Sequence, residues 1–472
     1  MTLYEQIADE ITQLVEVGTI RPGDRITSVR SMSERWGVSI PTVLQAYRLL
    51  EARRVIEARP QSGFYVRSKT PYDRLYHTRL KQLTPAAEIA TGDLIMRTLE
   101  IVSDPTLLPL GTALPDPALL PTGVLARCLS RAARHSTTGG SLMDLAPAGT
   151  LELRTQIARR ASAGGSIVQA DDVVVTCGGA EALSLCLRAT TQPGDTVAVE
   201  SPTWFGTLQI LDVLGLKAVE IPVYPGEGMS LPMLERALEH GRISAVVVTP
   251  TCQNPVGSVM SVDRKRALAQ LLAKYQVPAV EDDTYGDLSF KHERPRTLQS
   301  FDDAGLVLMC GSFSKTQAPA YRLGYAIPRR YRERVIHFKL ATTVTTSVPT
   351  QLAVADYLAK GGYDGYLRGL RRTFQTNVDR LRYEITARFP EGTRVSQPAG
   401  GFLLWVELPQ GIDMVDVQRG AIVKGLSVAP GPAFSASGLY RNCLRVNAGY
   451  QWSKRMADAL DLLAGICAVS IA

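Results

Sequence analysis

The sequence predicts a multidomain α/β protein, in which a small helical module with a β-hairpin precedes a large domain and a smaller C-terminal subdomain. Three observations predict it. Residues 1–67 carry short helical patterns followed by a hairpin pattern. From about residue 108, apolar β-rich runs alternate with helical patterns, which is typical of a mostly parallel sheet with helices on both faces. A chain of 472 residues also exceeds one ordinary core.

The composition is that of a soluble globular protein, with 45% hydrophobic and 21% charged residues. No apolar run approaches the roughly 20 residues that a membrane span needs, and the amphipathic N-terminus is unlike a signal peptide. Seven cysteines without CxxC spacing predict reduced thiols in a cytoplasmic protein and no metal site. The net charge of +7 permits an anionic partner such as DNA without requiring one.

The first module follows the order of a winged helix-turn-helix. Apolar residues at helical spacing predict a helix from Leu3 to Val15. Ser28 and Ser39 are candidate N-caps of two further helices, separated by a tight turn. Val55–Arg59 and Phe64–Val66 flank a turn and predict a hairpin. This order would place the helix after Ser39 in a major groove of DNA.

The module resembles the GntR family of bacterial repressors. The resemblance rests on Ser28-Val29-Arg30, Val38-Ser39, Thr42-Val43, Ala46-Tyr47 and the turn at Ser62-Gly63. That family usually carries an arginine after the capping serine, where this chain has Ile40-Pro41, so one phosphate or base contact is lost. The resemblance implies DNA contacts by Arg30, Ser39, Thr42, Gln45, Arg48 and Arg59. The alternative is a helical dimerisation module whose arginines only solvate one face.

Residues 68–107 are predicted to form a linker, because they lack a sustained core pattern. A short helix is expected within it over 88–99. Two interpretations of its basic first half stay open: it lies along a DNA backbone, or it is a solvated tether.

The large domain, residues 108–335, is expected to bind its ligand where parallel strands end. Strands are predicted over 173–177, 197–200, 218–221, 245–249, 279–281, 307–310 and 323–326. After the sixth of these, Lys315 lies beside Ser312 and Ser314, and Arg322 follows seven residues later. A partly desolvated lysine suits Schiff-base chemistry, and the serines and the arginine suit a phosphate. Together they suggest pyridoxal 5′-phosphate (PLP).

Four other strand ends carry residues that suit the same ligand. Gly179-Ala180 opens a helix whose free N–H groups can hold a phosphate. Trp204 offers a ring that can stack on a planar heterocycle, and Asn254 offers an amide in a rigid turn. Asp282 and Tyr285 place an acid and a phenol three residues apart. Each feature alone is common, so their order along the chain carries the inference.

Taken in order, these motifs resemble fold-type I PLP enzymes, the aspartate aminotransferase superfamily, over roughly residues 108–472. The resemblance implies that Lys315 forms a Schiff base with PLP and that Asp282 pairs with the pyridinium nitrogen. Asn254 and Tyr285 would bond the phenolate oxygen, and Trp204 would stack on the ring. The phosphate would be held by Gly179, Ala180, Ser312, Ser314 and Arg322.

Two departures and one further residue belong to this resemblance. Gly179 and Ala180 offer only backbone donors, where the superfamily often has hydroxyl or amide side chains. Asp144 stands where the superfamily usually has a tyrosine that reaches the phosphate of the neighbouring subunit. In the smaller subdomain, residues 336–472, Arg445 matches the arginine that grips a substrate α-carboxylate, and the carboxylate of an effector is its expected ligand.

A GntR-type module ahead of a fold-type I domain resembles the MocR subfamily of bacterial transcription regulators. The resemblance implies a cytoplasmic homodimer that binds operator DNA and senses an amino compound through PLP. Two alternatives stay open: a working aminotransferase with an appended DNA-binding domain, and a DNA-binding protein whose fold-type I domain is empty. Asp144 favours regulation, because a carboxylate facing the cofactor would repel its phosphate.

Overall fold

The computed structural model divides into two compact units, Met1–Arg74 and Leu75–Ala472. It describes residues 2–16, 20, 24–52, 55–59, 63–66, 85–137 and 146–469. Ser62 and Asp144, which the sequence singles out, lie outside these residues, and so does Gly18, the residue expected to end the first helix. None of the described helices is both long and apolar enough to cross a membrane.

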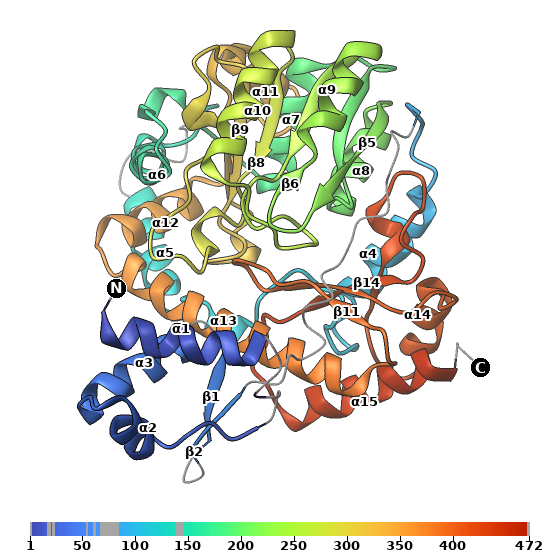
Figure 1. Cartoon of the computed structure of the whole chain (residues 1–472). Helices are drawn as coiled ribbons and strands as arrows, with labels where there is room; N and C mark the ends of the chain where they lie inside the picture. Colours follow the sequence, from blue (N-terminus) through green and yellow to red (C-terminus); the bar gives the residue numbers. More distant parts are fainter. Residues whose placement is uncertain are drawn as a thin grey trace. The chain divides into compact units, whose positions relative to one another are not determined.

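The N-terminal unit contains helices followed by a hairpin, as predicted (Figure 1). Its elements are α1 (Leu3–Glu16), α2 (Val29–Trp36), α3 (Ile40–Ala52), β1 (Ile56–Arg59) and β2 (Gly63–Val66), with β1 and β2 antiparallel. The Ser28 hydroxyl caps α2 by accepting the Ser31 N–H at 3.2 Å, and Gly37 ends it in the left-handed region. The helix-turn-helix therefore has sharp ends set by local residues.

The second unit is built on a mixed, mostly parallel sheet, as predicted. Its described strands lie in the order β3 (Val174–Thr176), β10 (Gly324–Ile327), β9 (Val307–Ser312), β8 (Ala279–Asp282), β7 (Ile243–Val248), β4 (Thr196–Ser201), β5 (Lys217–Tyr224) and β6 (Gly228–Met229). β9, β8, β7, β4 and β5 run parallel, whereas β10 and β6 are antiparallel to their neighbours. The seven predicted strands are all present; β6 was missed because it has two residues.

Helices cover both faces of this sheet (Figure 1). Along β4, Val197 and Val199 point to one face and Ala198 to the other, so the strand is buried on both sides. The first face is covered by α7 (Gly179–Thr190), α8 (Phe205–Val213) and α11 (Arg332–Leu340). The other is covered by α5 (Thr122–Thr137), α6 (Leu151–Ala163), α9 (Leu231–His240), α10 (Val262–Tyr275) and α12 (Val348–Ala359).

A second, antiparallel sheet forms the smaller subdomain. Its order is β11 (Arg394–Val395), β12 (Leu403–Glu407), β14 (Cys443–Asn447) and β13 (Ala429–Pro430). It packs with α13 (Tyr363–Arg388), α14 (Met414–Val423) and α15 (Lys454–Val469). The described part of the chain also has short 3-10 helices: η2 (Pro117–Leu119), η4 (Ala170–Asp172), η5 (Gly286–Leu288), η6 (Gln299–Phe301), η7 (Pro319–Tyr321), η8 (Arg329–Tyr331) and η9 (Gly431–Phe434).

Two segments pack elsewhere than their sequence position suggests. Part of the expected linker belongs to the core of the second unit. Ile95 of α4 (Gly92–Ser103) is buried in the same hydrophobic cluster as residues of α8, and Ala87 forms an isolated antiparallel β-bridge with Ala218. This helix begins four residues later than expected. In the C-terminal part of the chain, α12 packs against α5 and α6 on the large sheet rather than on the smaller one.

Candidate functional site

One cavity in the second unit gathers all ten residues that the sequence singles out for the cofactor. They come from the ends of the parallel strands and from the turns that follow them, as expected for this type of sheet. The lining consists of Leu114, Gly179, Ala180, Trp204, Asn254, Asp282, Thr284, Tyr285, Ser312, Ser314, Lys315 and Arg322. Leu114 and Thr284 are additions that sequence reasoning missed.

The anion-binding end of the cavity is formed by the start of α7. Gly178 has φ +86° and provides no side-chain cap, so the first N–H groups of the helix point outward without a capping partner from that residue. The Arg322 guanidinium lies beside this turn, and a Cβ at Gly178 would come within 2.7 Å of its Nη2. Glycine is therefore required here for both conformation and space.

Two serines of the turn after β9 complete this end. The Ser312 hydroxyl donates to the Ser314 Oγ at 3.0 Å, and the Ser314 N–H donates to the Ser312 Oγ at 3.2 Å. A helix N-terminus, two hydroxyl groups and an exposed guanidinium make a site suited to a phosphate.

Lys315 lines the cavity and is half-buried, with its Nζ donating to the Ala113 carbonyl at 2.7 Å. The same Nζ lies 5.8 Å from the centre of the Tyr285 ring. Burial and the positive charge of Arg445 lower the pKa of Lys315 from 10.5 to about 8, against the opposing effect of Asp282. A substantial share of this amine is therefore neutral and nucleophilic near neutral pH.

Asp282 and Tyr285 supply the acid and the phenol. The Thr284 N–H donates to Asp282 Oδ1 at 2.9 Å. Burial raises the pKa of this carboxyl, and hydrogen bonding by Thr284, followed by the charge of Lys315, opposes the rise. The Tyr285 Oη is buried and has no hydrogen-bond partner in the described part of the chain. An unpartnered buried hydroxyl is costly, so this phenol is poised to bond a ligand atom.

Trp204 is half-buried at the start of α8, and its ring lies directly over Gly206. A Cβ at Gly206 would overlap the Trp204 ring. The glycine therefore leaves room for this ring to line the cavity.

Arg445 is held beside the cavity rather than in its lining. It is 1% exposed; its Nη1 donates to Asn254 Oδ1 at 3.1 Å and its Nη2 donates to the Gly111 carbonyl at 2.7 Å. The rings of Phe205 and Phe434 each lie 5.0 Å from its guanidinium carbon. Burial lowers the pKa of Arg445 to about 10. Its Nε has no hydrogen-bond partner in the described structure, which leaves one donor for an anion.

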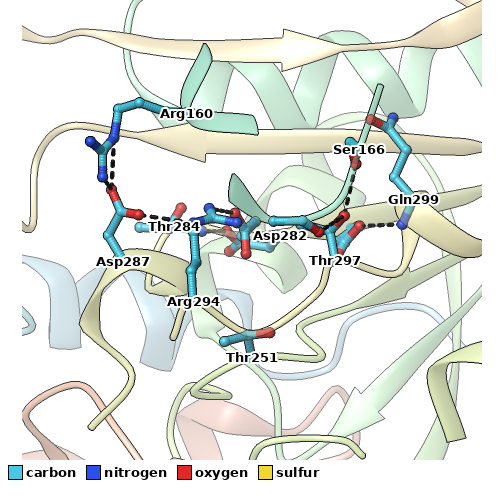
Figure 2. Close-up of polar contacts among 12 residues, drawn as sticks. Arg160, Ser166, Thr251, Asp282, Thr284, Asp287, Arg294, Thr297 and Gln299 are labelled. Carbon is cyan, nitrogen blue, oxygen red and sulfur yellow. Dashed lines mark hydrogen bonds and ion pairs between the residues drawn. The ribbon is translucent and has the colours of Figure 1, made fainter. Parts of the chain in front are cut away.

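A buried ionic network, drawn in Figure 2, supports the turn after β8. Arg294 pairs with Asp283 and, at 2.9 Å, with Asp287, and Arg160 also contacts Asp287 at 2.9 Å. Burial raises the pKa of Asp287, but the two arginines outweigh it and bring the value to about 2. Sequence reasoning missed this network, because its partners lie up to 127 residues apart and no local pattern links them.

A larger groove of about 830 Å³ lies between α5, α6 and α12. Of the charged residues in its lining, Arg131 and Lys360 each pair with Asp356. None of the residues that the sequence singled out lines it.

The residues expected to contact DNA lie in the N-terminal unit. Arg30 on α2 and Gln45 and Arg48 on α3 are exposed. The Ser39 hydroxyl lies 2.8 Å from the Thr42 Oγ1 at the start of α3. Arg59 is the last residue of β1 and pairs with Gly63.

Comparison with protein families and curated proteins matches both units. The model described as "Bacterial regulatory proteins, gntR family" matches residues 3–66, and the model "Aminotransferase class I and II" matches residues 120–459. The HTH-type transcriptional regulator YjiR of Escherichia coli is 40% identical over 463 residues, which cover 98% of this chain and 97% of YjiR. The regulator YdcR of the same organism is 35% identical and covers 98% of both chains.

Solved structures of aminotransferases match about four fifths of this chain. A kynurenine aminotransferase from Pyrococcus horikoshii, solved with PMP and kynurenine, is 28% identical with a TM-score of 0.72 over 80% of this chain and 95% of that chain. LysN of Thermus thermophilus, an α-aminoadipate aminotransferase complexed with N-(5′-phosphopyridoxyl)-L-leucine, has a TM-score of 0.72 and 25% identity, over 79% of this chain and 97% of that chain. The aminotransferase class I and II fold implies dependence on PLP.

Proposed function

The chain belongs to the GntR-type bacterial regulators that carry an aminotransferase class I and II domain, the MocR subfamily, and from this membership we propose that it is a PLP-dependent transcription regulator that senses an amino compound. The N-terminal unit binds operator DNA in the cytoplasm, and the cavity around Lys315 binds the cofactor and the effector. The single observation that carries the proposal is that every cofactor residue expected from the sequence lines one cavity.

The residues of the cavity fit PLP. The start of α7, Ser312, Ser314 and Arg322 suit its phosphate, and the unpartnered Tyr285 Oη suits its phenolate oxygen. Arg322 and Arg445 bring two guanidinium cations near Lys315, against the single carboxylate of Asp282. This excess of positive charge complements an anionic cofactor.

When bound, PLP supplies an aldehyde that condenses with amines and a protonated ring that withdraws electrons. The chain's own groups have separate tasks. Lys315 presents a neutral amine and accepts or returns a proton at its Nζ, which its lowered pKa permits near neutral pH. Asp282 would keep a proton on the ring nitrogen of the bound cofactor, and Trp204 would exclude water from one face of the site.

Arg445 is the proposed contact for the effector's carboxylate. It stands on β14 of the smaller sheet and bonds Asn254 and Gly111, so it connects three distant segments of the second unit. An effector that draws the guanidinium into a new, two-pronged bond alters this connection. The resulting shift between subdomains is the proposed signal to the DNA-binding units of a homodimer.

The alternative function, a working aminotransferase, is favoured by one observation. A lysine with a pKa of about 8 that lines the same cavity as Asp282 is suited to proton transfer as well as to binding. The two functions predict different outcomes, because turnover needs repeated release of product whereas sensing needs only binding.

The test uses the purified full-length chain. Its visible spectrum is recorded while candidate amino acids are added, and binding to the DNA upstream of its own gene is measured by gel shift. We expect a PLP absorbance, a spectral change with the effector, and DNA binding. Lys315→Ala should lose the borohydride-reducible chromophore; a variant that keeps it unchanged contradicts the proposal. Robust turnover without DNA binding would select the alternative.

A further inference from the structure

The outward face of α3 carries the apolar side chains of Ile40 and Leu44, and the GntR family usually has an arginine at the position of Ile40. Ile40 is 45% exposed and Leu44 is 37% exposed, four residues apart at the start of the helix. The opposite face forms the core of the unit: Val43, Ala46, Tyr47 and Leu50 are each 0% exposed. The two exposed residues therefore contribute little to this core, and their side chains are available to a partner.

The charge of α3 is distributed unevenly. Residues 40–47, its first two turns, contain no Asp, Glu, Lys or Arg, and the first cation is Arg48. Gln45 is the exposed polar side chain between Leu44 and the buried Ala46. Arg30 on α2 and Arg48 are both exposed and lie at the same helix-turn-helix. This arrangement suits a DNA groove, because the flanking cations can contact the phosphates at its edges while the apolar segment contacts the bases between them.

The chemistry of base edges then decides what this helix can read. Guanine is specified most often by the paired donors of Arg or Lys, and no such side chain stands in the first two turns. Thymine presents a methyl group in the major groove, and apolar side chains contact this methyl group. Adenine presents the N7 acceptor and the N6 donor there, and the side-chain amide of a glutamine can hydrogen-bond to both.

We propose that α3 selects A·T pairs, with Ile40 and Leu44 contacting thymine methyl groups and Gln45 hydrogen-bonding an adenine. The inference rests on the proposed function, since it assumes that α3 enters a major groove. Arg30 and Arg48 contact phosphates and set the position of the helix without adding sequence preference.

The experiment begins with the full-length chain and a library of random DNA duplexes. Bound duplexes are selected and sequenced, and the best is resynthesised with uracil replacing single thymines, which removes only the methyl group. We expect selected half-sites rich in A·T, and uracil at a contacted position should weaken binding about four-fold, because one buried methyl group contributes about 0.8 kcal/mol. Equal affinity for uracil and thymine duplexes at every position overturns the proposal.

Substitutions on α3 test whether Ile40 and Leu44 make these contacts with the bases. Leu44→Ala should lose the uracil effect at one position, and Ile40→Arg should shift the selected base to guanine. Leu3→Ala is the matched control, because Leu3 is 53% exposed on α1 of the same unit. This variant should leave the uracil effect and the selected bases unchanged. Selected sites that specify guanine under α3 in the parent chain contradict the inference alone. A chain that enriches no DNA at low salt contradicts the proposed function as well.

Discussion

Lys315 illustrates how single residues make this site work. Its amine is shielded from solvent and lies near the positive charges of Arg445 and Arg322, so its pKa falls from 10.5 to about 8. At pH 7.5 about a quarter of such an amine is neutral, against about one part in a thousand for an ordinary lysine. The folded chain holds this proton less tightly than the unfolded chain, so stability rises with pH between about 8 and 10.5.

The pH dependence of cofactor uptake tests this account. In the PLP-free chain, the rate of PLP uptake should rise with pH and level off above about 8. Arg445→Gln removes a positive charge and should move this midpoint to higher pH, though not to 10.5, because burial remains the larger cause. Arg419→Gln, which removes an exposed charge on α14, is the control and should leave the midpoint in place. Superimposable profiles for the parent and Arg445→Gln would contradict the account.

At the scale of elements, the turn from β3 into α7 controls the anion-binding end of the cavity. The left-handed Gly178 brings the helix start and Arg322 together, and Gly324 of β10 packs against the same turn too closely for a side chain. The N-terminus of a helix that follows such a turn presents backbone N–H groups to an anion, so no side-chain donor is needed. This explains how Gly179 and Ala180 can serve a phosphate with main-chain groups alone.

Gly178→Ala should therefore weaken PLP binding by roughly ten- to a hundred-fold, the equivalent of one charge-assisted hydrogen bond. The new Cβ displaces the Arg322 guanidinium and also strains the backbone. Gly194→Ala separates the two effects, because Gly194 has φ +89° and nothing within 4 Å of an added Cβ. It should lower the thermal midpoint but keep PLP affinity, as measured by titration of the PLP-free chain. Equal PLP affinity in both variants would show that Arg322 does not bind the phosphate.

For the whole molecule, sensing requires that the cavity and the DNA-binding unit influence each other. An effector that changes DNA affinity by a given factor must have its own affinity changed by DNA by the same factor. We expect a factor of about 5 to 150, which corresponds to a coupling of about 1–3 kcal/mol. Titration of the effector with and without operator duplex, followed by the visible spectrum, measures it.

The variant Lys315→Ala provides the control for this coupling. It should bind the duplex with parent-like affinity, since the N-terminal unit has its own core. It should no longer respond to the amino compound. An effector affinity that is the same with and without DNA would show that the two units do not communicate.

The sequence by itself determined the order of the strands along the chain, the helix-turn-helix and the residues that surround the cavity. These features follow from local periodicity, from caps such as Ser28 and Gly37, and from the rule that parallel strands present their carboxyl ends at one edge. The PLP and DNA contacts of individual residues stay predictions.

Only the tertiary structure decided which distant groups meet. It joined Arg445 to Asn254 and Gly111, and it built the Arg294 network in the turn after β8. It also packed α4 into the core of the second unit. Long-range partners leave no periodic signal in a single sequence, because a buried charge requires a compensating group but does not specify where in the chain that group must lie.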